Sequence, residues 1–503
     1  MARNEIREHF KKLCMEANHT LTRSEYRKLN TISEYNSSKI ETLWGTWKSF
    51  ISDVSCTINF NRFNIKKTVD KNVTDLVITS VIDGSDINFN CLNTLLTYCK
   101  EEKCKFYILW GKTTKPNSHF SKEEYNILEE YLVTDLTFQK DLKCKAIDLL
   151  IPITSKNPLM NLDKLSKGLN TIIVGSPKQY LDTLPHDNYD DYKIAISTGT
   201  ISEPDYKPCV SGLLDEQNHT FGGLRLEWNN EAKRYNVRQL QYKDEYIYDI
   251  TGKCYSEKEV TVKNNVVDCI VLGDLHEPET DNIALKNTIN MLLKLKPKEV
   301  MIHDWMSYQS INHHDESKVL TKLLNYTEDT ANLETELAIS IRMMNDIATA
   351  CPKSHFNIVY SNHDEFLMKW LNTGEFVKGD PANRVIGCEL FANIAKGKNV
   401  FHNKFVKNIT MLKPGQSLKI NGFEVGKHGD AGIAGAKGNI NAYVKTYNKS
   451  ITGHTHSPKI KESGVVVGTL SKLQLSYNKN SISNWAQANC VVYANGTFQL
   501  LFV

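Results

Sequence analysis

The sequence predicts an α/β protein in three consecutive regions, residues 1–67, 68–260 and 261–503. Two observations carry this prediction. The first region shows only the apolar spacing of helices, whereas the later regions alternate strand-like apolar runs with amphipathic helical segments. Such alternation favours sheets that are covered by helices. A chain of 503 residues, 41% hydrophobic, is long enough for several packed cores.

The first region is predicted to be helical and basic. In NEIREHFKKLCMEANHT, residues 4–20, apolar side chains recur at the spacing of one helix face. Two short helices around a Ser/Asn turn follow, and Ser37 or Ser38 is expected to cap the second of them. Residues 1–67 hold twelve Lys or Arg against seven Asp or Glu, an excess of five positive charges in a chain whose net charge is +3.

The second of these short helices resembles a motif of DNA-cleaving proteins. SSKIETLWGTWKSFI, residues 37–51, is similar to the small helical repeat attached to many phage and homing endonucleases. The resemblance implies a helix-turn-helix-like DNA-binding segment in which Arg27, Lys39 and Lys48 neutralise phosphates. The alternative is a plain helical hairpin that packs against the rest of the protein.

Residues 68–260 are predicted to form an α/β domain, to which the sequence assigns no role. TDLVITSVID and KFYILWG are strand-like and flank a helical segment, NFNCLNTLLTYCKEE. GLRLEWNNEAKRYNVRQLQY, residues 223–242, has the pattern of a hairpin with Asn229 and Asn230 near its turn.

Residues 261–503 carry the chemistry, because strand-like runs in this region end in metal-binding or proton-transferring side chains. These are Asp274 and His276, His303 and Asp304, Asn362, His363 and Asp364, His428 and Asp430, and His454 and His456. Ligands gather at the carboxyl ends of strands in open α/β sheets, so these residues are expected to share one edge. Asp274 and His276 are two positions apart, and alternate residues of an extended chain point to the same side.

The donor atoms select the class of metal. All of these side chains offer nitrogen or oxygen, which suits divalent Mn, Mg, Fe or Zn. The twelve cysteines are scattered without a Cys-x-x-Cys pair, so they are expected to be reduced thiols, mostly buried.

The order of these motifs resembles the calcineurin-like metallophosphoesterase superfamily over residues 270–460, most strongly in GDLH, SNHDE and GHTH. The resemblance implies a β-sandwich flanked by helices around two metal ions. It implies that Asp274, His276, Asp304 and His456 hold the first ion, and that Asn362, His428 and His454 complete the second. Asp304 is implied to bridge the two ions. His363 is implied as the general acid beside the leaving oxygen, which makes Asp304 and His363 the catalytic pair.

The chain departs from the family pattern in two places. HDWMS, residues 303–307, stands where the family has Gly-Asp-x-x-(Asp/Asn), and Ser361 replaces the usual Gly before Asn-His. The bridging acid remains. His303 is expected to pack, with a hydrogen bond to substrate or no role as the alternatives. The Gly-rich run after His428 is expected either to bring backbone N–H groups and Lys437 near a phosphate or to be a flexible connection.

The whole-chain pattern indicates a substrate class. TDLVITSVIDGSDINFNCLNTLLTYCKEEKCKFYIL, NPLMNLDKL and STGTISEPDY resemble the pre-early DNA-transfer proteins of certain siphophages, a group associated with Mn-dependent degradation of host DNA. The resemblance implies a phage-encoded DNase with two divalent ions, Mn first among them, and DNA as its partner. One alternative is a metallophosphatase or phosphodiesterase that acts on a small molecule or a protein. The other is a DNA-binding protein with structural metals.

No membrane partner is predicted. The sequence has no apolar span of about 18 residues, and its start has no apolar leader. The expected location is therefore the cytoplasm, that of the host if the chain is phage-encoded, and a homo-oligomer is left open.

Overall fold

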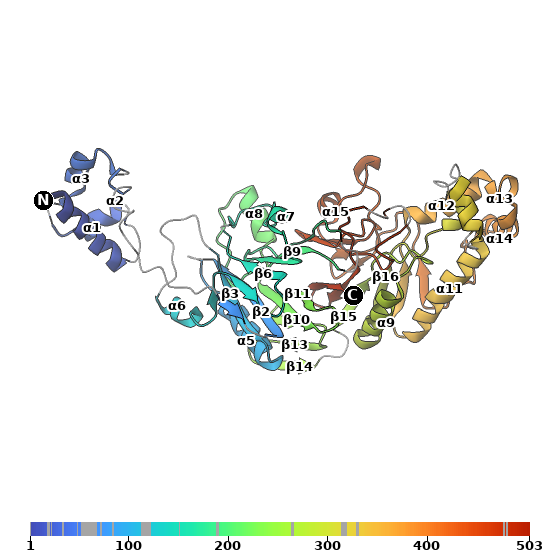
Figure 1. Cartoon of the computed structure of the whole chain (residues 1–503), viewed down its shortest axis with the longest axis horizontal. Coiled ribbons are helices and arrows are strands. Elements are labelled where there is room, and N and C mark those ends of the chain that lie inside the picture. Colours follow the sequence, from blue (N-terminus) through green and yellow to red (C-terminus); the bar gives the residue numbers. More distant parts are fainter. Residues whose placement is uncertain are drawn as a thin grey trace.

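A computed structural model of the chain shows a mixed α/β architecture (Figure 1). The structure describes residues 2–17, 21, 23–32, 35–47, 49–51, 68–70, 73–82, 85–111, 122–149, 151–187, 191–262, 266–312, 319–327, 331–475, 478 and 481–503. None of the helices in these ranges is both long and apolar enough to span a membrane. No disulfide joins the cysteines of these ranges, most of which are buried.

The first region is helical, as predicted, and has a core of its own. Its helices are α1 (Ala2–Ala17), α2 (Arg23–Leu29) and α3 (Ser37–Trp44). They enclose a cluster of buried side chains that includes Ile6, Phe10, Tyr26, Ile40 and Phe50. The rings of Phe10 and Phe50 meet edge to face with centroids 4.9 Å apart.

The cap of α3 differs from the predicted one. Asn36, and not Ser37 or Ser38, caps this helix, because its Oδ1 accepts a hydrogen bond from the N–H of Lys39 at 2.9 Å. Asn36 has extended backbone angles, φ −64° and ψ 159°, whereas Ser37 lies inside the first turn and is buried. A cap residue must stand outside the helix while its side chain reaches back to it, and Asn36 meets this condition.

An eight-stranded sheet forms in the second region among the described residues. Its order is β14 (Val260–Val262), β13 (Lys253–Tyr255), β12 (Tyr246–Tyr248), β11 (Arg234–Lys243), β10 (Gly222–Asn229), β2 (Asp75–Ile82), β3 (Lys105–Gly111) and β4 (Leu132–Val133). β10 and β11 form the predicted antiparallel hairpin. β2 and β3 are parallel, and the helix between them is α5 (Phe89–Glu101). Other helices here are α6 (Lys122–Leu128), α7 (Leu162–Leu165) and α8 (Val210–Gln217).

A second sheet, of eleven described strands, runs through both later regions. Its order is β1 (Thr68–Asp70), β5 (Leu136–Phe138), β6 (Cys144–Ile147), β7 (Thr171–Val174), β9 (Ile194–Ser197), β8 (Leu181–Thr183), β22 (Lys459–Lys461), β23 (Gly464–Val466), β21 (Ser450–Thr452), β20 (Phe423–Glu424) and β19 (Lys419–Ile420). β8 pairs with β22, with Leu181 opposite Ile460. The boundary predicted at residue 260 stays a prediction, and the two regions beside it share this sheet.

The third sheet positions the site. Its order is β18 (Ile409–Met411), β17 (His355–Ile358), β16 (Glu299–Ile302), β15 (Val267–Val271), β24 (Ala488–Tyr493) and β25 (Phe498–Phe502). Strands β15 to β18 are parallel neighbours, and β24 runs antiparallel to β15. The helices of this region are α9 (Asn282–Leu295), α10 (Val319–Thr327), α11 (Leu333–Ala350), α12 (Asn362–Thr373), α13 (Glu375–Lys378), α14 (Arg384–Ala395) and α15 (Ile440–Tyr447).

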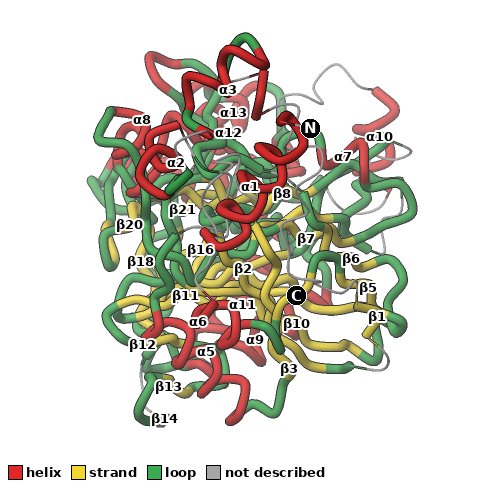
Figure 2. The backbone as a smooth tube through the Cα atoms, turned by 90° about the vertical axis from the view of Figure 1, so that its left-hand side faces the viewer, coloured by secondary structure: helices red, strands yellow, loops and turns green. Residues whose placement is uncertain are grey.

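A continuous hydrophobic core holds the three sheets together. Buried Leu226 of β10, Val271 of β15 and Ile451 of β21 belong to the same cluster. Figure 2 shows many of the strands in the middle and lower part of the molecule, and Figure 1 shows α1 to α3 at one end of it and α11 to α14 at the other. The edge of the six-stranded sheet is therefore held from several directions, which suits a site that needs fixed side chains.

Candidate metal centre

The polar residues predicted at strand ends come from loops of two sheets. β15, β16 and β17 are parallel neighbours, so their carboxyl ends lie at the same edge of the six-stranded sheet. The loops after β20 and β21 of the eleven-stranded sheet approach this edge. Four loops and the start of α12, which follows β17, supply the residues of the site. They are Asp274, His276, His303, Asp304, Asn362, His363, His428, His454 and His456.

One group of donors has the geometry of a cation site. Asp274, His276, Asp304 and His456 are all buried, and their ligand atoms lie within 4.8 Å of one another. His456 Nε2 is 3.2 Å from Asp274 Oδ2, and His276 Nε2 is 3.5 Å from Asp304 Oδ2. The Nε2 atoms of His276 and His456 are 2.8 Å apart. Two imidazoles and two carboxylates that converge in this way suit a divalent first-row ion.

A second group adjoins the first. Asp274, His303 and His428 also place ligand atoms within 4.8 Å of one another. His428 Nε2 lies 3.1 Å from Asp304 Oδ2, so Asp304 reaches donors of both groups. His454 lies beside them, with its ring centroid 5.2 Å from that of His428. Asp304 therefore lies near donors of both groups, and its role as a bridging ligand stays a prediction.

His303 lies among the donors, although the sequence favoured a packing role for it. The side chain is fully buried, and its Nδ1 is 3.4 Å from Nδ1 of His428. The family that the sequence resembles has glycine at this position, so no metal-binding role is predicted for His303 from the sequence. The signal that could have placed it here is its position next to Asp304 at the end of β16.

Six buried polar atoms of this centre have no hydrogen-bond partner among the described residues. They are Asp274 Oδ1, His303 Nε2, Asp304 Oδ1, Asn362 Oδ1, His428 Nε2 and His456 Nδ1. An unpartnered buried polar atom costs about 1–3 kcal/mol, and native folds contain few of them. Cations bound among these carboxylates and imidazoles would remove that cost. The residues present therefore fit metal ions.

The pKa values of the histidines follow from burial and from the two carboxylates. Burial lowers the pKa of His276 to about 3 and that of His303 to about 4, so both rings are neutral, the form that binds metal. Burial also opposes the charge on His428. The carboxylates of Asp304 and Asp274 outweigh it and raise the pKa of His428 to about 9. Without a cation, the negative charge of the centre is thus partly balanced by a proton.

The backbone at the donors adopts an uncommon conformation. His276, Asp304, His454 and His456 all have positive φ, between 40° and 74°. Residues other than glycine rarely adopt positive φ, and this backbone conformation costs of order 1 kcal/mol or more for each residue. A Cβ at Gly453 would stand 2.1 Å from Asp274 Oδ1, so only glycine leaves room for that carboxylate. The loops therefore hold these donors in place at a cost in backbone free energy.

The start of α12 places Asn362 and His363 beside the centre. Ser361 and Asp364 form a capping box at this helix end, and the Asp364 carboxylate also accepts from Trp305 Nε1 at 3.1 Å. Asp364 thus fixes the helix. The ring of His363 lies 4.8 Å from that of His276, and its Nδ1 donates to the carbonyl of Ser307 at 3.0 Å.

The residues predicted to bind DNA are only partly described. Lys39 is exposed on α3. Arg27 is exposed on α2, and its Nε donates to Ser37 Oγ at 2.8 Å. Lys48 lies outside the described residues. Arg27 and Lys39 thus lie on a group of helices that has its own hydrophobic core and is distant in sequence from the metal centre.

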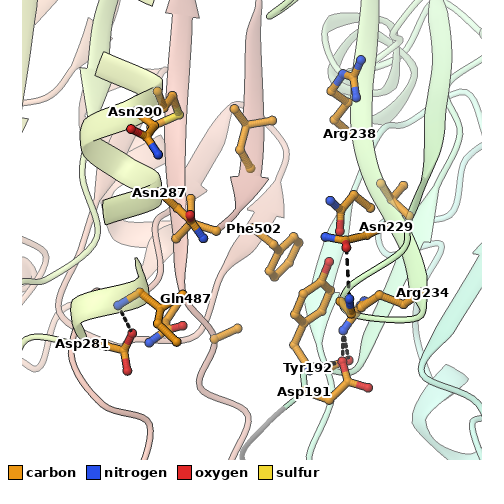
Figure 3. A pocket seen from close by; sticks show the side chains of 18 of the residues that line it. Asp191, Tyr192, Asn229, Arg234, Arg238, Asp281, Asn287, Asn290, Gln487 and Phe502 are labelled. Carbon is orange, nitrogen blue, oxygen red and sulfur yellow. Dashed lines mark hydrogen bonds and ion pairs between the residues drawn. The ribbon is translucent and has the colours of Figure 1, made fainter. Parts of the chain in front are cut away.

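Two pockets differ in their relation to the centre. A pocket of about 400 Å³ includes His428 and Asp430 in its lining. A larger one, of about 1090 Å³, lies between α9 and the β10–β11 hairpin, where Asn229 and Asn287 face each other across the opening (Figure 3). None of the metal donors is among its described lining residues, and its Arg234 is already paired with Asp191. The smaller pocket is therefore the one that adjoins the metal centre.

The fold and the site define a mixed α/β protein with a buried Asp/His centre that is compatible with metal ions. Among curated proteins, the chain is similar to Protein A1 of Escherichia phage T5. The two are 28% identical over 372 residues, which is 69% of this chain and 66% of Protein A1. The match thus spans slightly less than two thirds of that phage protein. No family model and no solved structure matches the chain.

Proposed function

We propose that this chain is a metal-dependent phosphodiesterase that cleaves DNA, with two divalent ions, of which Mn²⁺ is the expected one. The observation that carries the proposal is Asp304, a buried carboxylate that reaches donors of two adjoining groups. Divalent cations bound by these residues would lower the pKa of a water and stabilise charge on a phosphate, which is chemistry that phosphodiester hydrolysis needs.

The residues of the chain have separate roles in this proposal. Asp274, His276, Asp304 and His456 would hold the first ion, and Asn362, His428 and His454 the second, with His303 as a further donor. His363 would be the general acid. Its Nδ1–H is held by the carbonyl of Ser307, which orients the ring and leaves Nε2 to give a proton to the leaving oxygen.

The similar Protein A1 is a phage protein, which supports a phage origin. Host DNA in the host cytoplasm is the substrate that we propose, and one further observation favours DNA. The first region has an excess of five positive charges and exposes Arg27 and Lys39, which would neutralise phosphates. The fold in this proposal is that of a metallophosphoesterase sandwich, made by the six-stranded sheet and the facing part of the eleven-stranded sheet.

The test is a cleavage assay on circular and linear DNA with Mn²⁺, Mg²⁺, Fe²⁺ or Zn²⁺. We expect the wild type to cut circular DNA with Mn²⁺, and His363→Ala to be slower by about 10²–10⁴-fold, the range of general acid catalysis. His402→Ala, which changes a histidine away from the strand-end loops, serves as the matched control and should cut normally.

Two other outcomes would replace the proposal. Hydrolysis of bis(p-nitrophenyl) phosphate with DNA left intact would favour a phosphatase or phosphodiesterase for small molecules or proteins. Retention of intact DNA in a gel shift with every cation, unchanged in His363→Ala, would favour a DNA-binding protein with structural metals.

A further inference from the structure

The pocket of about 400 Å³ beside His428 has a lining that suits a planar ring. Three tyrosines from two segments contribute to it. Tyr360 precedes Asn362 by two residues, and Tyr443 and Tyr447 lie one turn apart on α15. Its volume is within the range of small-molecule sites, and His428 and Asp430 place it next to the metal centre.

The two tyrosine rings on α15 are nearly parallel, and that of Tyr443 is held by a hydrogen bond. Their centroids are 6.2 Å apart with an interplanar angle of 27°. The hydroxyl of Tyr443 donates to the carbonyl of Ala431 at 2.6 Å, which ties α15 to the Gly-rich loop after His428. Tyr443 is nearly buried, whereas Tyr447 is half-buried and keeps part of its ring open. Tyr447 is therefore the ring on which a ligand can stack.

The charges of the pocket argue against a phosphate inside it. Glu365 and Asp430 contribute two carboxylates, and among the described lining residues Lys427 is the one ammonium group. The Nζ of Lys427 is already engaged, since it donates to the carbonyl of Gly415. His428 also lines the pocket, but as a metal ligand it carries no proton charge. With metal bound, the two carboxylates therefore favour a neutral ring with amino groups, from which they accept hydrogen bonds, over an anion. Cytosine, adenine and guanine carry an exocyclic amino group, and thymine does not.

We propose that this pocket receives the nucleoside next to the phosphate held at the metal centre. Its base stacks on Tyr447, and Glu365 or Asp430 accepts a hydrogen bond from the exocyclic amino group. The inference rests on the proposed function, because it assumes that the centre holds a nucleic acid phosphate. It adds a base preference, against thymine, at one position beside the cleaved bond.

The test measures binding rather than cleavage. The Mn²⁺-loaded protein is titrated by calorimetry with deoxycytidine 3′- and 5′-monophosphate, thymidine 3′- and 5′-monophosphate, and deoxyribose 5-phosphate. We expect one deoxycytidine monophosphate to bind about tenfold more tightly than deoxyribose 5-phosphate, which is the size of one base stacked on an aromatic ring. Tyr447→Ala should abolish this advantage, and Tyr447→Phe should keep it.

Two variants complete the design. Glu365→Gln should reduce the preference for deoxycytidine over thymidine, while stacking remains. Tyr326→Ala changes a tyrosine on α10 that is 78% exposed, and should bind all ligands as the wild type does. Equal binding of deoxycytidine monophosphate and deoxyribose 5-phosphate by the wild type would overturn the inference, and so would an undiminished advantage in Tyr447→Ala. Failure of the proposed function shows separately, as DNA left intact in the cleavage assay.

Discussion

Two of the buried clusters of charged side chains among the described residues differ in how their polar atoms are satisfied. In the first cluster, Asp249 accepts hydrogen bonds from Arg238 at 2.8 and 2.9 Å, from Tyr98 at 2.8 Å and from Gln499 at 2.9 Å. Both oxygens of Asp249 therefore have partners. This cluster joins α5, β11 and β25, and its carboxylate is satisfied by protein groups without a ligand.

The metal centre is just as buried but is not complete in itself. Asp274 and Asp304 each keep one oxygen without a hydrogen-bond partner among the described residues. Burial of a carboxylate alone therefore does not indicate a site. Asp274 and Asp304 indicate one because their unpartnered oxygens lie beside several imidazoles that can also bind a metal, and the fold would otherwise carry an uncompensated cost.

The strongest loss of activity is expected at the metal centre. Asp304→Asn removes the charge that reaches both donor groups, and we expect affinity for Mn²⁺ and any hydrolysis to fall by at least about 100-fold, the upper range seen for residues that only support a ligand. Calorimetric titration with Mn²⁺ measures the loss. Asp346→Asn, an exposed acid on α11, is the control and should bind Mn²⁺ normally. Wild-type affinity in Asp304→Asn would mean that Asp304 is not a ligand.

The second prediction concerns the free energy of unfolding and the cluster around Asp249. Asp249→Asn leaves the buried guanidinium of Arg238 without its main partner, which typically costs about 3–5 kcal/mol of unfolding free energy. Urea denaturation measures this loss. Asp244→Asn, on an exposed turn of the same region, should stay within about 0.5 kcal/mol of the wild type. If Asp249→Asn were as stable as wild type, the contrast between the clusters would be lost.

The smallest effect concerns protons. The pKa of His428 in the metal-free fold is raised to about 9 from 6.5, so its stabilising contribution is complete below pH 6.5 and is lost as the pH rises through 9. A metal must displace that proton, so affinity for Mn²⁺ should rise by up to about tenfold per pH unit toward pH 9. Calorimetry at pH 7.5 in two buffers of different ionisation enthalpy should show release of close to one proton. Binding enthalpies independent of the buffer would contradict this.

The sequence was informative where a local pattern determines the structure. The helices of the first region, the β10–β11 hairpin and the strands before Asp274 and Asp304 follow from apolar spacing and turn residues. The approach of Asp274, His276, Asp304 and His456 could also be predicted, because parallel strands deliver their loops to one edge.

Other features depend on contacts between distant parts of the chain. Capping of α3 by Asn36 depends on which residue stands outside the first turn. Asn36, Ser37 and Ser38 are adjacent and can all cap a helix, so residue type alone does not identify the cap. The place of His303 depends on His428, 125 residues away, and the pairing of β8 with β22 spans more than 250 residues. No local pattern contains that information.

The pairing of β8 with β22 also constrains how this protein can be divided. A fragment that begins after residue 260 would keep β22 but lose the strand on one side of it, and a bare strand edge invites association with other chains. Separating the two later regions, in the laboratory or during evolution, would thus expose a strand edge that is paired in the intact protein and would promote aggregation. A protein that retained only the region with the Asp/His centre would need substitutions that protect this edge.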